Sequence, residues 1–246
     1  MEMNLVVDIG NTLVKLAVFK QNLLVHFKLV TEFDSTVIEN LFHEFQCSNI
    51  IFSNTRNSLS TENLNISPKN SINFTYQTKI PIQNKYQSPE TLGMDRLAAV
   101  IGAQAKFPNQ NTLVIDAGTC ITYDFVDEFG NYFGGAISPG LQMRFSALHH
   151  FTGKLPKINF NDFKENRLIG RSTNESIISG VVNGLAFEIE GFIDKYSVYE
   201  NLNVLITGGD HEILVKVLKN NIFATPFLVL EGLNEVLNFN STNIVQ

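Results

Sequence analysis

Apolar and polar positions along this chain follow two patterns, one typical of buried strands and one typical of helices. Residues 5–19, LVVDIGNTLVKLAVF, contain two runs of branched apolar residues separated by a short polar turn, which is typical of two buried strands. Residues 37–45 place their apolar side chains at helical spacing, and residues 49–54, NIIFSN, return to a buried-strand pattern. Strands joined by crossover helices predict an α/β fold with mixed β-sheets.

The middle of the chain is less regular. Residues 56–73 are polar and rich in Asn and Ser, so we predict a loop there. Leu97, Ile101 and Ala105 line one side of a predicted helix that ends near the segment 107–112, FPNQNT. This turn-forming segment is the predicted seam between two halves of the chain.

The second half repeats the alternation. Residues 131–140, NYFGGAISPG, predict a strand that runs into a glycine-rich turn, and residues 141–148 predict a helix. Residues 203–210, NVLITGGD, predict a last buried strand. Its glycine pair, Gly208 and Gly209, allows two interpretations that both stay open: an ordinary strand-to-helix turn, or a place where the backbone approaches a nucleotide closely.

A long helix is predicted to begin after Ser172, which is followed three residues later by Glu175 in the manner of a capping box. Gly180 and Gly184 lie four positions apart on this helix and would permit close contact with another helix. The apolar side of the helix consists of Ile177, Val181, Val182, Leu185, Ile189 and Phe192.

An internal repeat fixes the organisation of the chain. Residues 113–126, LVIDAGTCITYDFV, follow the same plan as residues 5–19: an apolar strand, an Asp-x-Gly turn with a threonine, and a second strand. The two aspartates, Asp8 and Asp116, are 108 positions apart. A repeat of this length predicts two related halves, which we place at residues 1–110 and 111–246.

Composition and charge narrow the classes of function. The net charge is −6, whereas a protein that binds nucleic acid is usually basic, so we predict no nucleic-acid partner. The two cysteines, Cys47 and Cys120, could pair, but a chain of this size needs no disulfide, which favours a reducing compartment. We find no signal-peptide pattern and no uninterrupted apolar stretch of about 18 residues, and therefore predict a soluble cytoplasmic protein without a membrane partner.

The turn at residues 8–12 could bind phosphate. Backbone N–H groups of a tight Gly/Asn turn can form a concave anion site, Thr12 adds a hydroxyl and Lys15 adds a positive charge. Asp8 would repel phosphate unless Mg²⁺ lies between them. The alternative is a hairpin turn with an exposed aspartate, but the second copy at Asp116 favours a functional role. We expect Asp116 and Thr119 to face the first turn across a cleft.

A third acidic position lies at the start of the predicted helix in TLGMDRLAAV, residues 91–100. Asp95 could simply stabilise the helix end through the helix dipole. It could instead act as a catalytic base, with Arg96 as an anchor for an anionic substrate, since the guanidinium group pairs with carboxylates in a planar geometry. The adjacent His149 and His150 point in different directions on a helix, and we assign them no chemistry.

Four motifs together resemble a known family. Asp8-Ile-Gly-Asn-Thr12, Gly93-Met-Asp-Arg96, Asp116-Ala-Gly-Thr119 and the run GGAISPG occur in the order and at spacings compatible with type III pantothenate kinases. The resemblance implies a duplicated ribonuclease-H-like fold of the actin-like ATPase superfamily, with mixed sheets, a central cleft and one such domain in each half. It also implies a homodimer that uses ATP to phosphorylate pantothenate, the first step of coenzyme A biosynthesis.

The resemblance also implies roles for individual residues and cofactors. Asp95 would be the catalytic base, Asp116 a ligand of a monovalent cation, K⁺ or NH₄⁺, and Mg²⁺ would accompany ATP. Cys120 departs mildly from the family, which more often has a small residue such as Ala there. The expected ATP contacts are Asp8, Ile9, Gly10, Asn11, Thr12, Leu13, Val14, Lys15 and Thr119, and the expected pantothenate contacts are Tyr86, Gly93, Met94, Asp95, Arg96 and Thr173.

Two alternatives stay open at this point. One is another phosphotransferase or phosphohydrolase of the same superfamily, which would differ in the acceptor of the phosphoryl group. The other is a catalytically silent relative that binds nucleotide and regulates a partner. The intact set of Asp8, Asp95, Arg96, Asp116 and Thr119 argues against the silent relative, because such a protein would be free to lose these residues.

Overall fold

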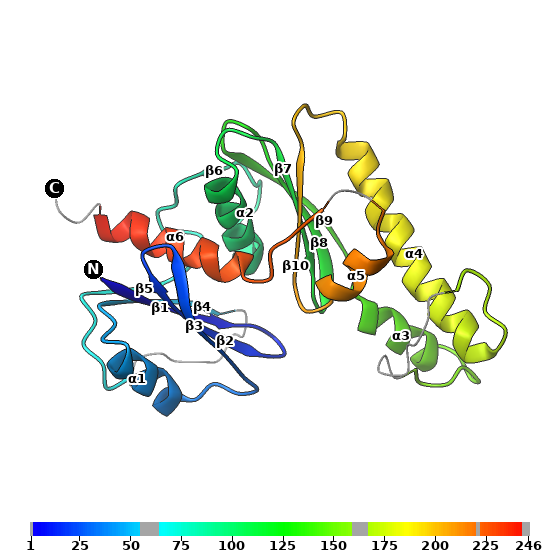
Figure 1. Ribbon diagram of the computed structural model, residues 1–246, viewed down its shortest axis with the longest axis horizontal. Coiled ribbons are helices and arrows are strands. Elements are labelled where there is room, and N and C mark those ends of the chain that lie inside the picture. The colour runs from blue at the N-terminus through cyan, green and yellow to red at the C-terminus, as the bar shows by residue number, and fades with distance from the viewer. Residues whose placement is uncertain (1, 55–63, 159–166, 220–221, 243–246) are drawn as a thin grey trace. The chain divides into compact units, whose positions relative to one another are not determined.

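The computed structural model describes residues 2–54, 64–158, 167–219 and 222–242 (Figure 1). The chain forms two compact units, each with an α/β arrangement. Unit 1 consists of Met1–Asn109, Phe129–Phe133 and Phe227–Gln246, and unit 2 consists of Gln110–Glu128 and Gly134–Pro226. The chain therefore passes from unit 1 to unit 2 inside the predicted seam. The division into halves at residue 110 stays a prediction, because the compact units also gather two later segments into unit 1.

The sheet of unit 1 has the strand order β3-β2-β1-β4-β5. The apolar runs of residues 5–19 form β1 and β2, an antiparallel pair, and β4 and β5 extend the sheet in parallel. Apolar side chains of β1, β2 and β4 pack on α1 and form the core. The elements are β1 (Met3–Ile9), β2 (Val14–Lys20), β3 (Leu23–Val30), α1 (Ser35–Glu44), β4 (Asn49–Asn54) and β5 (Asn70–Asn73).

The strands of unit 2 repeat this plan. The second sheet has the order β11-β10-β7-β8-β9-β6, so β9-β8-β7-β10-β11 corresponds strand for strand to β3-β2-β1-β4-β5. The β7–β8 pair is antiparallel and the β7–β10 and β10–β11 pairs are parallel, as in the equivalent positions of unit 1. The strands of this second sheet are β6 (Gln83–Asn84), β7 (Thr112–Ala117), β8 (Cys120–Val126), β9 (Asn131–Pro139), β10 (Asn203–Thr207) and β11 (Phe223–Ala224). Of these, β6 and residues 131–133 of β9 belong to unit 1. The two sheets are thus copies of one mixed α/β plan.

Helix α4 (Thr173–Tyr196) covers the sheet of unit 2 (Figure 1). The predicted cap is present, because the Ser172 hydroxyl accepts a hydrogen bond from the Glu175 N–H at 3.3 Å. The Glu175 carboxylate accepts from the Arg171 N–H at 2.7 Å, so the reciprocal bond goes one residue further back than in a strict capping box. Helices α3 (Leu141–His150) and α5 (His211–Val217) complete the helices described in this unit.

The expectation that no apolar segment is long enough to cross a membrane needs correction. Helix α4 has 24 residues, and by its length and its hydropathy alone it could cross a membrane. Its apolar side chains, however, pack against β7, β8 and β10 in the core of unit 2. The hydropathy of α4 is therefore explained by its place in the core, as in long core helices of water-soluble proteins.

The end of the chain returns to unit 1. Helix α6 (Leu228–Thr242) packs along α2 (Met94–Lys106), which follows the short 3₁₀ helix Pro89–Thr91. Glycines permit this contact: a Cβ at Gly232 would overlap the Ala98 carbonyl, and a Cβ at Gly102 would lie 2.6 Å from the Leu228 carbonyl oxygen. Because α6 covers it, α2 is buried without a break from Arg96 to Ala103.

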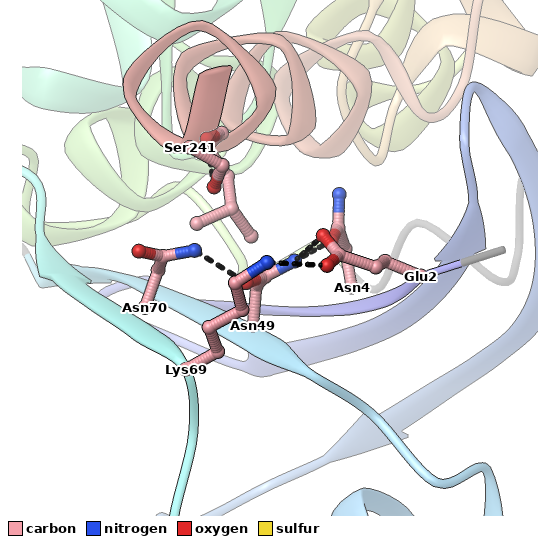
Figure 2. Close-up of polar contacts among 7 residues, drawn as sticks. Glu2, Asn4, Asn49, Lys69, Asn70 and Ser241 are labelled. Atoms are coloured by element: carbon pink, nitrogen blue, oxygen red, sulfur yellow. Dashed lines mark hydrogen bonds and ion pairs between the residues drawn. The ribbon is translucent and has the colours of Figure 1, made fainter. Parts of the chain in front are cut away.

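A hydrogen-bonded chain of side-chain amides fixes α6 on the sheet of unit 1, and Figure 2 shows its members on the strands, Asn70, Asn49 and Asn4. The Asn4 side-chain amide donates to Asn234 Oδ1 at 2.8 Å and to Asn238 Oδ1 at 2.7 Å, both on α6. Asn49 donates to Asn4 Oδ1 at 2.9 Å, and Asn70 donates to Asn49 Oδ1 at 2.7 Å. Neighbouring strands β1, β4 and β5 are thereby linked to the last helix of the chain.

One further expectation from the sequence is wrong in detail, and the structure adds information on two others. The predicted loop 56–73 ends in a strand, since Asn70–Asn73 forms β5; residues 55–63 of that loop lie outside the described residues. Ala105 is exposed, so the buried face of α2 ends at Ala103. Gly180 and Gly184 make no close helix contact within the described chain, because a Cβ at either would meet no atom within 4 Å.

Candidate active site

The first turn joins β1 to β2 and holds Asp8 at the end of the buried strand. The Gly10 N–H closes the turn by donating to the Leu13 carbonyl at 3.1 Å. Asn11 and Thr12 at its tip are exposed, so their side chains are accessible to a ligand. Asp8 lies opposite Lys15 in the β1–β2 register, and the ammonium nitrogen is 3.7 Å from Asp8 Oδ2. The turn therefore combines accessible polar groups with an ion pair whose carboxylate is buried and whose ammonium group is partly exposed.

Asp8 is only 4% exposed, so the alternative of an exposed aspartate at a plain hairpin turn is wrong. Burial raises the pKa of this carboxyl; the positive charge of Lys15 opposes the rise, and the negative charge of Asp95 adds to it. Asp8 Oδ1 accepts no hydrogen bond from the described residues. Burial of a carboxylate oxygen without a partner costs free energy. Asp8 Oδ1 is therefore suited to bind a cation that arrives with the ligand.

The start of α2 holds the predicted base and anchor. The Arg96 N–H donates to Asp95 Oδ1 at 2.8 Å, so the carboxylate folds back over the first turn of the helix. Gly93 makes this possible, since a Cβ there would lie only 2.5 Å from Asp95 Oδ1. Gly93, Met94 and Asp95 are partly buried and Arg96 is buried. Gly93 therefore leaves room for the Asp95 carboxylate in the position that it takes here.

Tyr86 lies beside this helix start. The guanidinium carbon of Arg96 is 5.7 Å from the centre of the Tyr86 ring, which is a cation–π contact. Two of the six residues that were predicted to contact the acceptor are thus in contact with each other. Asp95 in turn is close enough to Asp8 for its charge to act on the Asp8 carboxyl. Unit 1 therefore brings together Asp8, Lys15, Tyr86 and the start of α2.

The second turn, in unit 2, is closed in a similar way. The Gly118 N–H donates to the Cys120 carbonyl at 3.0 Å, and the Gly140 N–H at the end of the GGAISPG run donates to the Thr119 carbonyl at 3.1 Å. Gly208 has a φ of +90°, and a Cβ on it would overlap Asp116 Oδ1 and the backbone of Ala117. Glycine is thus required there by the turn and by the close approach to the Asp116 carboxylate.

The remaining predicted residues are more scattered. Thr173 is exposed as the first residue of α4, and Cys120 is exposed with its Sγ 3.9 Å from Met143 Sδ. Cys47 and Cys120 are both free thiols. His149 Nδ1 is 2.8 Å from the Leu155 carbonyl oxygen, a local contact. Within the described parts of the chain, no three His, Cys, Asp or Glu side chains gather as a metal site.

Asp116, Thr119 and Thr173 belong to unit 2, whereas Asp8 and Asp95 belong to unit 1. That the two turns face one another therefore stays a prediction. Ser53 is a residue that the sequence reasoning missed: it lies opposite Asp8 in the parallel β1–β4 pair, and its buried hydroxyl is close enough to the Asp8 carboxylate to oppose the rise of its pKa. The signal for it was the polar end of the strand NIIFSN, next to the polar end of β1.

Solved structures of other proteins share this fold. A component of (R)-2-hydroxyglutaryl-CoA dehydratase from Acidaminococcus fermentans matches with a TM-score of 0.56 at 14% identity and covers 100% of both chains. A glucokinase from an Antarctic psychrotroph matches with a TM-score of 0.55 at 10% identity, over 97% of this chain and 99% of its own. The fold is the duplicated ribonuclease-H-like fold of actin-like ATPases and sugar kinases, as predicted.

Sequence relatives are far closer. The type III pantothenate kinase of Flavobacterium johnsoniae is 43% identical over 245 residues, which is 98% of this chain and 100% of that protein. The type III pantothenate kinase of Christiangramia forsetii is 43% identical over 250 residues, again 98% of this chain and 100% of that protein. The family model for type III pantothenate kinase matches residues 4–195, a range that contains every predicted site residue. This chain belongs to the type III pantothenate kinase family.

Proposed function

We propose that this chain transfers the γ-phosphoryl group of ATP to pantothenate, the first step of coenzyme A biosynthesis, with Asp95 as the catalytic base. The observation that carries the residue assignment is the group in unit 1: the accessible turn over the Asp8–Lys15 ion pair, next to a helix start with Asp95, Arg96 and Tyr86. Family membership supports the reaction itself.

Asp95 binds and orients the hydroxyl group of pantothenate. Phosphoryl transfer proceeds through a loose transition state, so the base needs only to position the nucleophile and to accept its proton late. Arg96 holds the carboxylate of pantothenate, for which its forked N–H groups are suited. Tyr86, Gly93 and Met94 form the rest of the acceptor contacts, and Thr173 adds a further one.

The turn between β1 and β2 holds the phosphates of ATP. Its backbone N–H groups and the hydroxyl of Thr12 donate to phosphate oxygens, and Lys15 supplies positive charge. Mg²⁺, which enters with ATP, neutralises phosphate charge. The partnerless Oδ1 of buried Asp8 fits such a cation, directly or through water, and Ser53 adds a second buried oxygen beside it.

Asp116 is the proposed ligand of a monovalent cation, K⁺ or NH₄⁺, and Thr119 contacts ATP. The close passage of Gly208 beside the Asp116 carboxylate supports a site in which backbone carbonyls and this carboxylate lie together. Oxygen ligands of this kind suit a hard cation. When bound, the cation offsets phosphate charge that Lys15 alone cannot neutralise.

The enzyme is proposed to act as a homodimer in the cytoplasm. One face of α4 carries Gly180, Gly184 and the exposed Phe187, which is 59% accessible, and no described atom lies within 4 Å of a Cβ at either glycine. An apolar helix face with small residues supports close packing against a second copy. The free thiols Cys47 and Cys120 suit a reducing compartment.

The test is an assay with labelled ATP and pantothenate, in K⁺, NH₄⁺ or Na⁺ buffers. We expect phosphopantothenate to form, faster with K⁺ or NH₄⁺ than with Na⁺ alone. Asp95→Asn should lower kcat by at least about 100-fold, the usual contribution of a general base, while the circular dichroism and Tm stay those of the wild type. Glu44→Gln, which neutralises an exposed carboxylate on α1, is the matched control and should keep full activity.

Each result bears on a different part of the proposal. Absence of any phosphorylated pantothenate from the wild-type enzyme would overturn the function. Near-normal turnover by Asp95→Asn would contradict the assignment of Asp95 as the base. Equal rates in Na⁺ and K⁺ would contradict the proposed cation site.

A further inference from the structure

Three planar groups lie in a row beside the start of α2. The guanidinium carbon of Arg96 is 5.7 Å from the centre of the Tyr86 ring. The Tyr86 ring is in turn 6.2 Å, centre to centre, from the Tyr132 ring, and the two ring planes differ by 12°. This separation lies within the range of offset-stacked aromatic pairs. Arg96, Tyr86 and Tyr132 therefore form one continuous stack within unit 1.

The members of the stack differ in how firmly they are held. Tyr132 is fully buried, at 0% exposure, whereas Tyr86 is only half-buried. The Tyr132 carbonyl accepts the Lys85 N–H at 2.8 Å, and Tyr132 lies opposite Asn84 in the pairing of β6 with β9. The Tyr86 N–H donates to Asn84 Oδ1 at 3.0 Å. The backbone that carries Tyr86 is thus tied to the strand that carries Tyr132.

The buried ring of Tyr132 limits the movement of the half-buried ring of Tyr86. A half-buried tyrosine has rotamer freedom that it must lose to stay against Arg96, and a ring behind it reduces that freedom. A guanidinium group binds a carboxylate through two parallel hydrogen bonds, so its orientation decides the strength of binding. An anchor that is already oriented binds its ligand with a smaller loss of entropy.

We propose that Tyr132 is a positioning residue for the acceptor site: its fixed ring backs Tyr86, and Tyr86 holds the Arg96 guanidinium in the orientation that binds the carboxylate of pantothenate. The inference rests on the proposed function, in which Arg96 and Tyr86 contact the acceptor. Tyr132 itself acts through Tyr86 and does not touch the substrate.

The test replaces the ring of Tyr132 while keeping the core filled. Tyr132→Met fills a similar space with a flexible chain, whereas Tyr132→Phe keeps the ring. For Tyr132→Met we expect the KM for pantothenate to rise roughly three- to tenfold, the change that the loss of one aromatic pair produces. Its kcat and its KM for ATP should stay within about twofold of the wild type, since the Asp95 and phosphate contacts are intact. Tyr132→Phe should keep the wild-type KM.

Two controls separate positioning from mere packing. Phe19→Leu alters another fully buried aromatic residue of unit 1, at the far end of β2, and should lower Tm without changing the KM for pantothenate. In a Tyr86→Leu background, Tyr132→Met should raise the KM by less than about twofold, because the intermediate ring is already gone.

The outcomes distinguish this inference from the function on which it rests. If the wild-type enzyme phosphorylates pantothenate and Tyr132→Met keeps its KM, the positioning role is overturned and the function stands. The role is also overturned if Tyr132→Met changes kcat and both KM values together, or if its effect persists in Tyr86→Leu. If the wild-type enzyme does not use pantothenate at all, the proposed function itself fails.

Discussion

At the scale of single residues, the site holds a carboxylate that the fold alone does not stabilise. Asp8 is buried, its pKa is raised by that burial, and one of its oxygens lacks a partner among the described residues. Lys15 is a single, half-exposed counterion at 3.7 Å. Residues of this kind are kept for binding or catalysis at a cost in stability.

Asp8→Asn is therefore expected to stabilise the free protein while removing activity. Because the pKa of Asp8 is higher in the folded than in the unfolded chain, its ionised form favours unfolding at neutral pH, and this cost vanishes in acid where both states are protonated. We expect Tm to rise by about 2–4 °C at pH 7 to 8, the shift that ~1 kcal/mol produces in a chain of this size, and the rise to fade toward pH 4.

Thermal unfolding of the ligand-free protein, followed across pH, measures this effect, and Glu44→Gln is the control for loss of an exposed carboxylate. A lower Tm for Asp8→Asn at pH 7 would mean that the Lys15 ion pair outweighs the burial.

The sequence singled out Asp8, Asp95 and Arg96 as candidate site residues, but it did not predict which other residues lie beside them. The cost of a charge at the end of a buried strand singled out Asp8, and the motif spacing singled out Asp95 and Arg96, which the structure brings to one helix start. The positions of Ser53 opposite Asp8 and of Tyr132 opposite Asn84 could not be predicted from their neighbours in sequence, because they depend on which strands pair. Local patterns specify a strand, but only tertiary contacts specify its partner.

At the scale of elements, the crossing of α2 and α6 positions the site. The two helices approach so closely that Gly102 and Gly232 have no room for a side chain. The apolar pattern of α2 predicted the helix, but its continuous burial results from α6, which lies more than 120 positions later in the chain. No local pattern in the sequence of α2 predicts such a partner.

Gly232→Ala tests the crossing. A methyl group there would overlap the Ala98 carbonyl, so the helices must separate, and overpacking of this kind typically costs about 1–3 kcal/mol. We expect the urea midpoint to fall accordingly with an unchanged m-value. Gly153→Ala, at a glycine whose Cβ would meet no described atom within 4 Å, should leave the free energy of unfolding within about 0.5 kcal/mol of the wild type. Equal stability of both variants would contradict a close crossing.

At the scale of the whole molecule, the two sheets share one strand order, which the repeat of Asp-x-Gly turns in the sequence had indicated. The proposed dimer is a separate matter, and the exposed face of α4 is the surface proposed for it. Gly180, Gly184 and Phe187 lie on that face with room around the glycines.

Gly180→Leu is expected to weaken the proposed dimer and to leave the subunit intact. Leucine is a better helix former than glycine by up to about 1 kcal/mol, and a Cβ at this position would lie in open space, so the isolated subunit should not lose stability. Sedimentation at graded concentrations should show a shift toward monomer. Asn40→Leu, on the exposed side of α1, is the control. An unchanged dimer would show that two copies associate elsewhere.

The return of α6 to unit 1 also bears on synthesis of the protein. Asn4 and Asn234 are hydrogen-bonded although 230 positions separate them, and α2 is covered only once α6 is in place. While the chain emerges from the ribosome, every motif residue is made before the segment that completes their support. A premature stop near residue 227 would leave all the motifs present, but unit 1 would lack α6.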